Sequence, residues 1–558
     1  MILIRYGICE GGAGAGAKIW RAPADCQTPA ARFGAMAERF DVIVIGGGHA
    51  GAEASALAAR AGAHTLLLTQ NLETIGQMSC NPAIGGIAKG TVVREVDALG
   101  GVMGRATDRA RIQFRMLNRS KGPAVWSPRA QCDRGLYRGA VRGLLEREPR
   151  LRLGQGTVSA LLVEQGRVAG VALEDGRRFA ARAVVVTTGT FLRGRIHLGL
   201  DASLSAGRAG DPSSVSLSQA LVNQGLTRER FKTGTPPRID GRTVDFQRLD
   251  RQDGDAREYW FSHYECAPHP EQRPCYLTWT GERLREIISA SLSQSALYGG
   301  AISGRGPRYC PSIEDKIVKF PDAERHQVFL EPEGLDTTEL YVNGLSTSLP
   351  PEVQLAFLRT VPGLERVEIT RPGYAIEYDY FPPTQLTPDL QVRQLPGLFL
   401  AGQVNGTTGY EEAAGQGVVA GLNAAASVAG GEPVVFGRGD AYLGVLVDDL
   451  VSRGVDEPYR LFTSRSEFRL LLRQDNALRR LLPFAERSGL LHAEELRLAE
   501  ARLRREDQVL ELAEHTTVDP DDANPLLADF GSSAVRRPFR VADLARRPGV
   551  SMADLLAI

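Results

Sequence analysis

The sequence of 558 residues has no excess of either charge, because 66 Lys and Arg are balanced by 66 Asp and Glu. A nucleic-acid partner would therefore have to be bound by a local basic patch, since the chain as a whole offers no positive field. The sequence also has no apolar run near the roughly 18 residues that cross a bilayer. Its first residues lack the apolar core of a signal peptide. We therefore expect a cytoplasmic protein that does not enter a membrane.

Cysteine is scarce, and its spacing forms no recognisable pair. The seven cysteines include no Cys-x-x-Cys motif and no spacing typical of structural zinc, so we expect no bound metal. Their odd number argues against a disulfide framework, and free thiols in a reducing compartment are the simpler interpretation. The remaining composition, 43% hydrophobic and 24% charged, is that of a globular protein. At roughly 100–200 residues per domain, the length predicts about three domains.

A strand, a glycine turn and a helix follow one another early in the chain. Residues 40–45 (Phe-Asp-Val-Ile-Val-Ile) predict a buried parallel strand, residues 52–61 have the Ala-rich composition of a helix, and residues 64–69 predict a second strand. Such a β-α-β unit opens a doubly wound α/β sheet. Further strands are predicted at 183–187 and 397–400.

The turn between the first strand and the helix contains Gly46-x-Gly48-x-x-Gly51, in the context that a dinucleotide-binding site requires. The glycines allow a tight turn, and the helix N-terminus offers free N–H groups to a pyrophosphate. The alternative is a glycine-rich turn that only packs the helix on the strand. The usual ribose-binding acid after the second strand is replaced by residues 69–71 (Thr-Gln-Asn), so we expect neutral groups such as Thr69 or Asn71 to contact the ribose.

Two later segments favour FAD over NAD at this turn. Residues 184–189 (Val-Val-Val-Thr-Thr-Gly) are similar to the second glycine turn of flavoproteins with two dinucleotide sites. Residues 398–403 lead to an Ala- and Gly-rich helix around 415–426, similar to the element that places a helix N-terminus at the flavin. Each segment alone could be a sheet strand with a tight turn. Their order along the chain favours a flavoprotein.

Two cysteines stand in unusual surroundings. Cys80 begins a loop constrained by glycine and proline, and Cys310 stands among charged and aromatic residues. A buried structural cysteine is the commoner case, but Arg308 and Lys316 would favour a thiolate at Cys310 if they lie close to it. Cys275 has a weaker case for function.

The window 105–138 is strongly basic, with nine basic residues against two acids, a net charge of +7. The sequence leaves two interpretations open, a solvated helix face and a phosphate-binding surface. The basic residues are Arg105, Arg109, Arg111, Arg115, Arg119, Lys121, Arg129, Arg134 and Arg138.

Four long and unusual blocks carry a family resemblance: residues 46–54, 76–86, 306–316 and 402–412. Shorter matches lie at 121–125, 232–238 and 458–465. Together they resemble the MnmG (GidA) family of tRNA uridine 5-carboxymethylaminomethyl modification enzymes. The resemblance extends from about residue 38 to the end of the chain.

The resemblance implies an FAD-dependent enzyme that adds a carboxymethylaminomethyl or aminomethyl group to C5 of the wobble uridine in tRNA. It implies methylenetetrahydrofolate as the carbon donor, glycine or ammonium as the amine, and NADH as the reductant of the flavin. It also implies a homodimer and a heterotetramer with an MnmE-type GTPase. Two alternatives stay open: a folate- and FAD-dependent tRNA uracil-5-methyltransferase, and a non-catalytic, flavin-stabilised tRNA-binding scaffold. The missing Cys-x-x-Cys disfavours a flavin disulfide reductase.

The same resemblance implies the site residues. Cys80 and Cys310 are expected to be the catalytic thiols, with Cys310 adding to C6 of uracil and Cys80 assisting at the flavin or in proton transfer. FAD contacts are expected from Gly46, Gly47, Gly48, His49, Ala50, Gly51, Val158, Ser214 and Gln403. The nicotinamide nucleotide is expected along Gly306, Pro307, Arg308, Tyr309, Pro311, Ser312, Ile313, Glu314, Asp315, Lys316, Ile317, Val318, Lys319 and Phe320.

The expected fold class is α/β: a doubly wound FAD-binding Rossmann-type domain with an inserted α/β domain and a C-terminal helical region. The FAD-binding domain is predicted over 36–224 and 376–436, and an inserted NADH-binding or substrate domain over 225–375. A disordered extension is predicted over 1–35 and a helical region over 437–558, with a helical segment from Glu494 to Ala513. The N-terminal arm is extra relative to the family, and the family usually continues beyond the position of Ile558, so we expect a truncated C-terminus.

Overall fold

The computed structural model describes residues 38–256, 258–308 and 311–558. The predicted extension over 1–35 and the residues Tyr309 and Cys310 lie outside the described residues. The described chain forms two compact units, one ending at Leu490 and the other running from Leu491 to Ile558. Each unit is described by itself.

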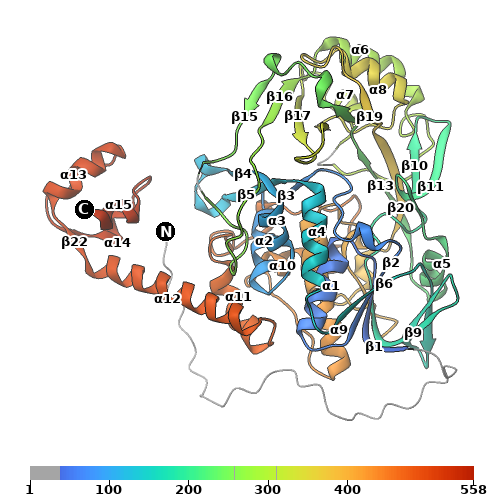
Figure 1. The fold of residues 1–558 in the computed structure, drawn as a ribbon, viewed down its shortest axis with the longest axis horizontal. Coiled ribbons are helices and arrows are strands. Elements are labelled where there is room, and N and C mark those ends of the chain that lie inside the picture. Colours follow the sequence, from blue (N-terminus) through green and yellow to red (C-terminus); the bar gives the residue numbers. More distant parts are fainter. Residues whose placement is uncertain (1–37, 257, 309–310) are drawn as a thin grey trace. The chain divides into compact units, whose positions relative to one another are not determined.

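The larger unit contains a sheet of mainly parallel strands, of which β1, β2, β6 and β9 are labelled in Figure 1. Its strand order is β6-β2-β1-β9-β8-β7, and β21 pairs with the end of β9. The residues of β1 from Val42 to Ile45 are buried, as expected for a parallel strand that is covered on both faces. The sheet therefore confirms the predicted α/β class. The strands are β1 (Glu38–Ile45), β2 (Thr65–Thr69), β6 (Leu151–Gln155), β7 (Val158–Glu164), β8 (Arg167–Leu173), β9 (Arg178–Val186) and β21 (Leu398–Leu400).

Two helices pack closely against each other beside this sheet: α1 (His49–Arg60), which follows β1, and α9 (Tyr410–Ala429), which follows β21. Two glycines of α9 permit the contact. A Cβ atom at Gly417 would lie 2.2 Å from the carbonyl oxygen of Ala50, and one at Gly421 would lie 2.3 Å from that of Ala54. Since α1 and α9 follow parallel strands of one sheet, both helices begin at the carboxyl edge of that sheet.

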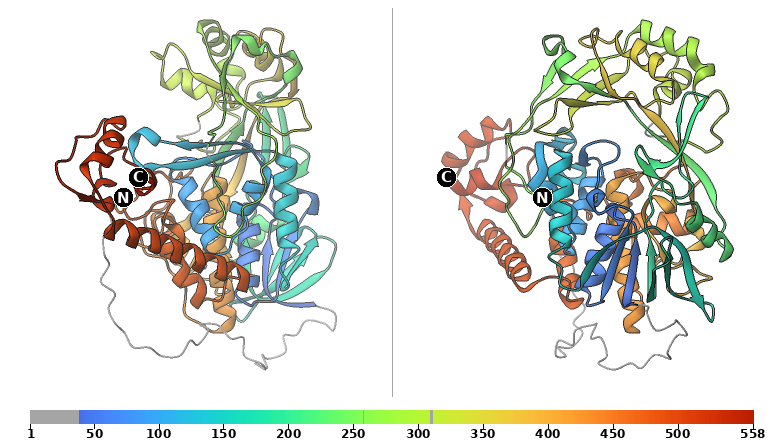
Figure 2. Two further views of the ribbon diagram at one scale, coloured as in Figure 1. Left: turned by 60° about the vertical axis from the view of Figure 1, so that its left-hand side comes forward. Right: turned by 45° about the vertical axis from the view of Figure 1, so that its right-hand side comes forward.

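A second sheet belongs to the region between β9 and β21, and with its helices it forms the green-to-yellow lobe in Figure 2. Along β18, Leu340 and Val342 lie in an apolar core with α6 (Glu282–Ser291), α7 (Ile313–Lys319) and α8 (Pro351–Leu358). Because side chains alternate along a strand, Tyr341 and Asn343 point to the other face. The order is β15 (Asp250–Gln252), β16 (Cys275–Trp279), β17 (Gln327–Pro332), β18 (Glu339–Asn343), β14 (Arg238–Asp240) and β19 (Ile369–Arg371).

The larger unit contains two further sheets. One has the order β12-β11-β10-β20-β13, and the other, β3-β5-β4, is formed near the first helices. The strands of the first are β10 (Arg195–Leu198), β11 (Ala202–Arg208), β12 (Asp211–Pro212), β13 (Glu229–Thr235) and β20 (Tyr374–Tyr380). Those of the second are β3 (Ala83–Gly85), β4 (Arg111–Leu117) and β5 (Ser127–Cys132).

Helices connect these sheets and form the end of the chain. The long helix α12 (Ala493–His515) confirms the helical segment predicted from Glu494 to Ala513. Together with α13, α14 and α15 it forms a small unit with its own apolar cluster, which includes Leu527 and Leu544. None of the helices in the described ranges is long and apolar enough to cross a membrane. The remaining helices are α2 (Lys89–Ala98), α3 (Met103–Ala110), α4 (Arg134–Leu145), α5 (Val215–Asn223), α10 (Tyr442–Asp448), α11 (Ala477–Arg487), α13 (Pro520–Asp529), α14 (Val541–Leu544) and α15 (Met552–Ala557).

The space around two glycines predicts that their substitution by alanine changes the free energy of unfolding in opposite directions. Gly417→Ala places a methyl group against the backbone of Ala50, so we expect it to lower the free energy of unfolding by about 1–3 kcal/mol. Gly139 lies in α4 with open space around its Cβ position, so Gly139→Ala should raise that free energy by up to about 1 kcal/mol. Urea unfolding followed by circular dichroism measures both. Equal stability of the two variants would contradict the described packing.

Candidate functional site

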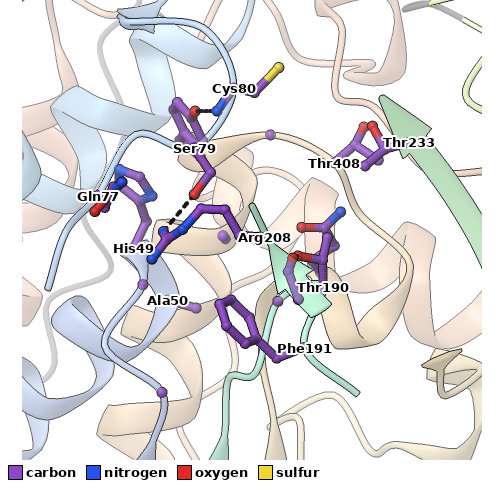
Figure 3. A pocket seen from close by; sticks show the side chains of 18 of the residues that line it. His49, Ala50, Gln77, Ser79, Cys80, Thr190, Phe191, Arg208, Thr233 and Thr408 are labelled. Atoms are coloured by element: carbon purple, nitrogen blue, oxygen red, sulfur yellow. Dashed lines mark hydrogen bonds between the residues drawn. The ribbon is translucent and has the colours of Figure 1, made fainter. Parts of the chain in front are cut away.

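A cavity of about 550 Å³ opens at the carboxyl edge of the main sheet. The starts of α1 and α9, the loop that contains Cys80, and residues of β13 and β18 line it. Figure 3 shows that side chains from separate segments, such as His49, Cys80 and Thr233, surround one space. Segments more than 300 residues apart in sequence, such as Gly46 and Gln403, therefore contribute to one site.

The turn after β1 has the geometry of a phosphate-binding loop. Gly46 has a φ of +110°, a conformation that favours glycine, and a Cβ at Gly51 would lie only 1.7 Å from the carbonyl oxygen of Gly46. Thr187 Oγ1 fixes the turn by donating to the carbonyl oxygens of Ile45 and Gly46, at 2.9 and 3.0 Å. Space is open beside Gly48, the N-cap of α1, and no side chain caps this helix. Its first N–H groups are therefore available to an anion.

Four buried polar atoms of the cavity wall lack a hydrogen-bond partner among the described residues: His49 Nε2, Gln77 Oε1, Thr188 Oγ1 and Ser214 Oγ. Leaving such an atom unpaired typically costs about 1–3 kcal/mol. A polar ligand in the cavity would satisfy them. Together with the glycine turn, these atoms show that the residues present fit a bound dinucleotide.

His49 is uncharged at neutral pH. Burial, with a smaller contribution from the nearby charge of Lys89, lowers the pKa of its imidazole to about 3. The ring stacks on Tyr410, the first residue of α9, with 4.3 Å between ring centroids. The contact joins the starts of the two helices, and it leaves the imidazole as a neutral hydrogen-bonding group beside the phosphate-binding turn.

The structure brings together most of the residues expected to contact FAD. Gly46, Gly47, Gly48, His49, Ala50, Val158, Ser214 and Gln403 all line the cavity. Gly51 packs against the turn behind them. Thr69 and Asn71 also line the cavity, and Asn71 Oδ1 accepts the N–H of Glu73, so this oxygen already caps the short helix that follows β2.

The segment expected to bind the nicotinamide nucleotide is divided between several environments. Pro307 lines the large cavity, whereas Gly306, Asp315 and Lys319 line a second cavity of about 300 Å³. Other residues of the segment hold α7 in place. Ile313 and Ile317 lie in the apolar core, and Ser312 caps the helix. Glu314 accepts the N–H of Ser348, and Lys316 donates to the carbonyl oxygen of Gly344. Val318 and Phe320 are exposed.

Cys80 lies on the wall of the large cavity. Its Sγ atom is 3.0 Å from the hydroxyl of Tyr341, and its N–H donates to the hydroxyl of Tyr410 at 2.7 Å. Arg134 and Arg238 donate to its carbonyl oxygen and lie over the ring of Tyr341. In Figure 3 the sulfur points away from His49 and Arg208. These hydrogen bonds fix both the N–H and the carbonyl oxygen of Cys80, and its sulfur lies beside the hydroxyl of Tyr341.

The other described cysteines have different surroundings. Cys132 and Cys275 are buried, and burial raises the pKa of both thiols, that of Cys275 to about 12. Cys266 is exposed. Cys80 is therefore the only cysteine in the described ranges that lines the cavity, while Cys310 lies outside those ranges. The part of the chain that the structure describes holds no group of His, Cys, Asp or Glu side chains suited to a metal.

The basic window 105–138 is not a solvated helix face, and that interpretation is wrong because the window runs through α3, β4, β5 and into α4. Several of its arginines pair with acids from distant segments: Arg109 with Glu265, Arg119 with Asp255, Arg129 with Glu331, and Arg134 with Glu333. Arg105 and Arg111 are buried. The phosphate-binding interpretation stays a prediction.

Sequence reasoning did not single out three residues of the cavity wall: Lys89, Tyr341 and Asn343. Lys89 Nζ lies 2.8 Å from Glu411 and 3.5 Å from Glu412, in the first turn of α9, and Glu411 also accepts the N–H of Gly85 at 2.6 Å. The alternation of polar and apolar residues in β18 was the available signal for Tyr341 and Asn343. This alternation predicts that the two residues share one face of the strand, but only the fold shows that this face lines the cavity.

A family model described as "Glucose inhibited division protein A" matches residues 41–432. The chain belongs to the GidA family. It is 53% identical to a protein of Thermodesulfovibrio yellowstonii named tRNA uridine 5-carboxymethylaminomethyl modification enzyme MnmG, over 91% of this chain and 82% of that protein.

Two solved structures of GidA from Aquifex aeolicus are similar to this chain in both fold and sequence. The form II crystal structure has a TM-score of 0.85 and 48% identity and covers 93% of this chain and 83% of that one. The form I structure has a TM-score of 0.83 and 50% identity, with 90% and 86% covered. The family resemblance and the Rossmann-type fold class predicted from the sequence are both confirmed.

The contact between Cys80 and Tyr341 predicts that Tyr341 controls the reactivity of this thiol. Tyr341→Phe removes the hydroxyl that can donate to a thiolate, and hydrogen bonds to charged groups contribute about 1.5–3 kcal/mol. We expect alkylation of Cys80 by iodoacetamide at pH 7 to be about 10-fold slower in this variant. Peptide mass spectrometry measures it, with exposed Cys266 as the internal control. An unchanged rate at Cys80 would show that the hydroxyl does not act on the sulfur.

Proposed function

We propose that this chain is an FAD-dependent enzyme that modifies C5 of the wobble uridine in tRNA by adding a carboxymethylaminomethyl or aminomethyl group. The observation that supports it most is the position of Cys80, a thiol on the wall of a cavity that fits a dinucleotide. The 53% identical relative carries the name of an enzyme for this modification. A tRNA substrate and a uridine target are therefore the best supported part of the proposal.

The residues of the cavity would hold FAD along its length. The turn from Gly46 to Gly48 and the uncapped start of α1 would bind the pyrophosphate, and the residues around Thr69 and Val158 the adenosine end. The start of α9, whose N-cap is Gly409, would lie at the flavin end. When bound, the flavin supplies redox and one-carbon chemistry that side chains lack.

Three co-substrates complete the proposed reaction: methylenetetrahydrofolate as the carbon donor, glycine or ammonium as the amine, and NADH as the reductant. Within the segment 306–320, the residues that line a cavity, Gly306, Pro307, Asp315 and Lys319, are the ones we propose for contact with the nicotinamide nucleotide. The proposed partners are tRNA, an MnmE-type GTPase and a second copy of this chain. The resemblance to the MnmG family supports these partners.

C5 of uracil is a poor nucleophile, and the proposed thiols would overcome this difficulty. Addition of a thiolate to C6 forms an S–C6 bond and moves the C5–C6 π electrons toward O4, so that C5 can attack an electrophilic methylene carbon. Loss of the C5 proton then expels the thiolate and restores the double bond. We propose that Cys310 adds to C6 and that Cys80, held beside the hydroxyl of Tyr341, assists in proton transfer.

Nucleoside analysis of bulk tRNA tests this function in a strain that lacks the native enzyme and expresses this chain. We expect the carboxymethylaminomethyl group to return with the wild-type chain and with Cys266→Ser, whose thiol is exposed and outside the cavity. Cys80→Ser should lower the rate of modification by about 100-fold or more, the usual contribution of a positioned proton-transfer group, and so leave the bulk tRNA largely unmodified.

Other outcomes of that analysis would contradict the proposal in distinguishable ways. A methyl group alone would assign the chain to the uracil-5-methyltransferase reaction. No modification, with bound FAD that NADH does not reduce, would indicate a tRNA-binding scaffold. No modification, with bound FAD that NADH reduces, would indicate an intact flavin core that does not engage its partner. Full modification by Cys80→Ser would remove this thiol from the mechanism.

A further inference from the structure

One face of β18 presents polar side chains to the cavity, next to Cys80. Tyr341 and Asn343 both line the cavity, while Leu340 and Val342, which alternate with them, lie in the apolar core. Tyr341 pairs in register with Glu331 of β17, and Arg129 of β5 reaches the same carboxylate. The face therefore combines hydrogen-bonding groups from three strands beside the thiol.

The orientation of the Asn343 amide is fixed by its neighbours. Its Nδ2 atom donates to Glu331 Oε1 at 3.1 Å, and Arg129 Nη2 donates to the same oxygen at 2.6 Å. Glu331 is only 2% exposed, and its Oε1 atom forms an ion pair with Arg129. Rotating the amide by half a turn would place its oxygen against this carboxylate, which is unfavourable. Asn343 Oδ1, which has no partner within the described residues, and the second N–H of Nδ2 are thus left for a ligand.

An amide fixed in this way matches the imide edge of uracil. Its oxygen can accept the N3–H of the base, and its remaining N–H can donate to an adjacent carbonyl oxygen of the ring. Cytosine has an unprotonated N3 and an amino group at this edge. The amide oxygen of Asn343 would then face N3 of cytosine, and since both atoms are hydrogen-bond acceptors, no hydrogen bond could form between them. We propose that Asn343 binds the imide edge of the target uracil and selects uridine over cytidine.

This assignment rests on the proposed function. It also determines the direction in which the reacting C5–C6 edge of the base points. In uracil, C6 lies directly across the ring from N3. When N3 is bound at Asn343, the C5–C6 edge faces away from that residue. Tyr341, two residues earlier on the same face of β18, holds the sulfur of Cys80 at 3.0 Å. One strand face would therefore provide both base recognition and the contact to a thiol.

The test measures the binding of two RNAs to the FAD-loaded, full-length chain. Fluorescein-labelled anticodon stem-loops that differ only in uridine or cytidine at the wobble position are titrated by fluorescence anisotropy. A bidentate contact of this kind typically discriminates by about 10-fold or more. We expect the wild-type chain to prefer uridine by that factor and Asn343→Ala to bind both RNAs within about 2-fold.

Two further variants keep the result interpretable. Asn343→Leu preserves the volume of the side chain without its polar atoms, and it should lose the preference while its flavin absorbance stays at the wild-type level. Gln327→Ala changes an exposed residue of β17 that does not line the cavity, and it should keep the preference. Wild-type discrimination in Asn343→Ala or in Asn343→Leu would overturn the assignment of Asn343 alone. Equal binding of both RNAs by the wild-type chain would overturn the assignment and count against the proposed uridine-directed function as well.

Discussion

The close approach of α1 and α9 is the constraint on which the site depends. Gly417 and Gly421 let α9 lie against the backbone of Ala50 and Ala54, and this contact brings the uncapped starts of two helices to one edge of the main sheet. The stacked rings of His49 and Tyr410 join these starts, and Tyr410 in turn accepts the N–H of Cys80. The packing of two helices therefore determines where the thiol loop stands relative to the phosphate-binding turn.

The second sheet completes the site from the opposite direction. Its apolar face is buried against helices, so its polar face is available to the cavity. The arginines and acids on and near this face form ion pairs: Arg129 pairs with Glu331, and both Arg134 and Arg238 pair with Glu333. Buried ion pairs of this kind contribute less to stability than to fixed geometry, and here they hold Asn343 and the carbonyl oxygen of Cys80.

Features that depend on local sequence could be predicted, and features that depend on distant partners could not. The strands at 40–45, 64–69 and 397–400 were predictable because buried parallel strands consist of continuous apolar runs. The glycine turn was predictable because its conformation requires glycine. The ion pairs of the window 105–138 could not be predicted, since the acids that pair with its arginines stand far along the chain. Likewise, Ile313 and Ile317 belong to the core although the block around them looks functional.

The most direct test of this account is an experimental structure of the FAD-loaded chain bound to an anticodon stem-loop. We expect continuous density for the dinucleotide from the turn at Gly46 to the start of α9 at Tyr410. We also expect the target base between the flavin and the polar face of β18, with its imide edge at Asn343. Density for the flavin ring outside the cavity that Cys80 lines, or a target base far from β18, would contradict it.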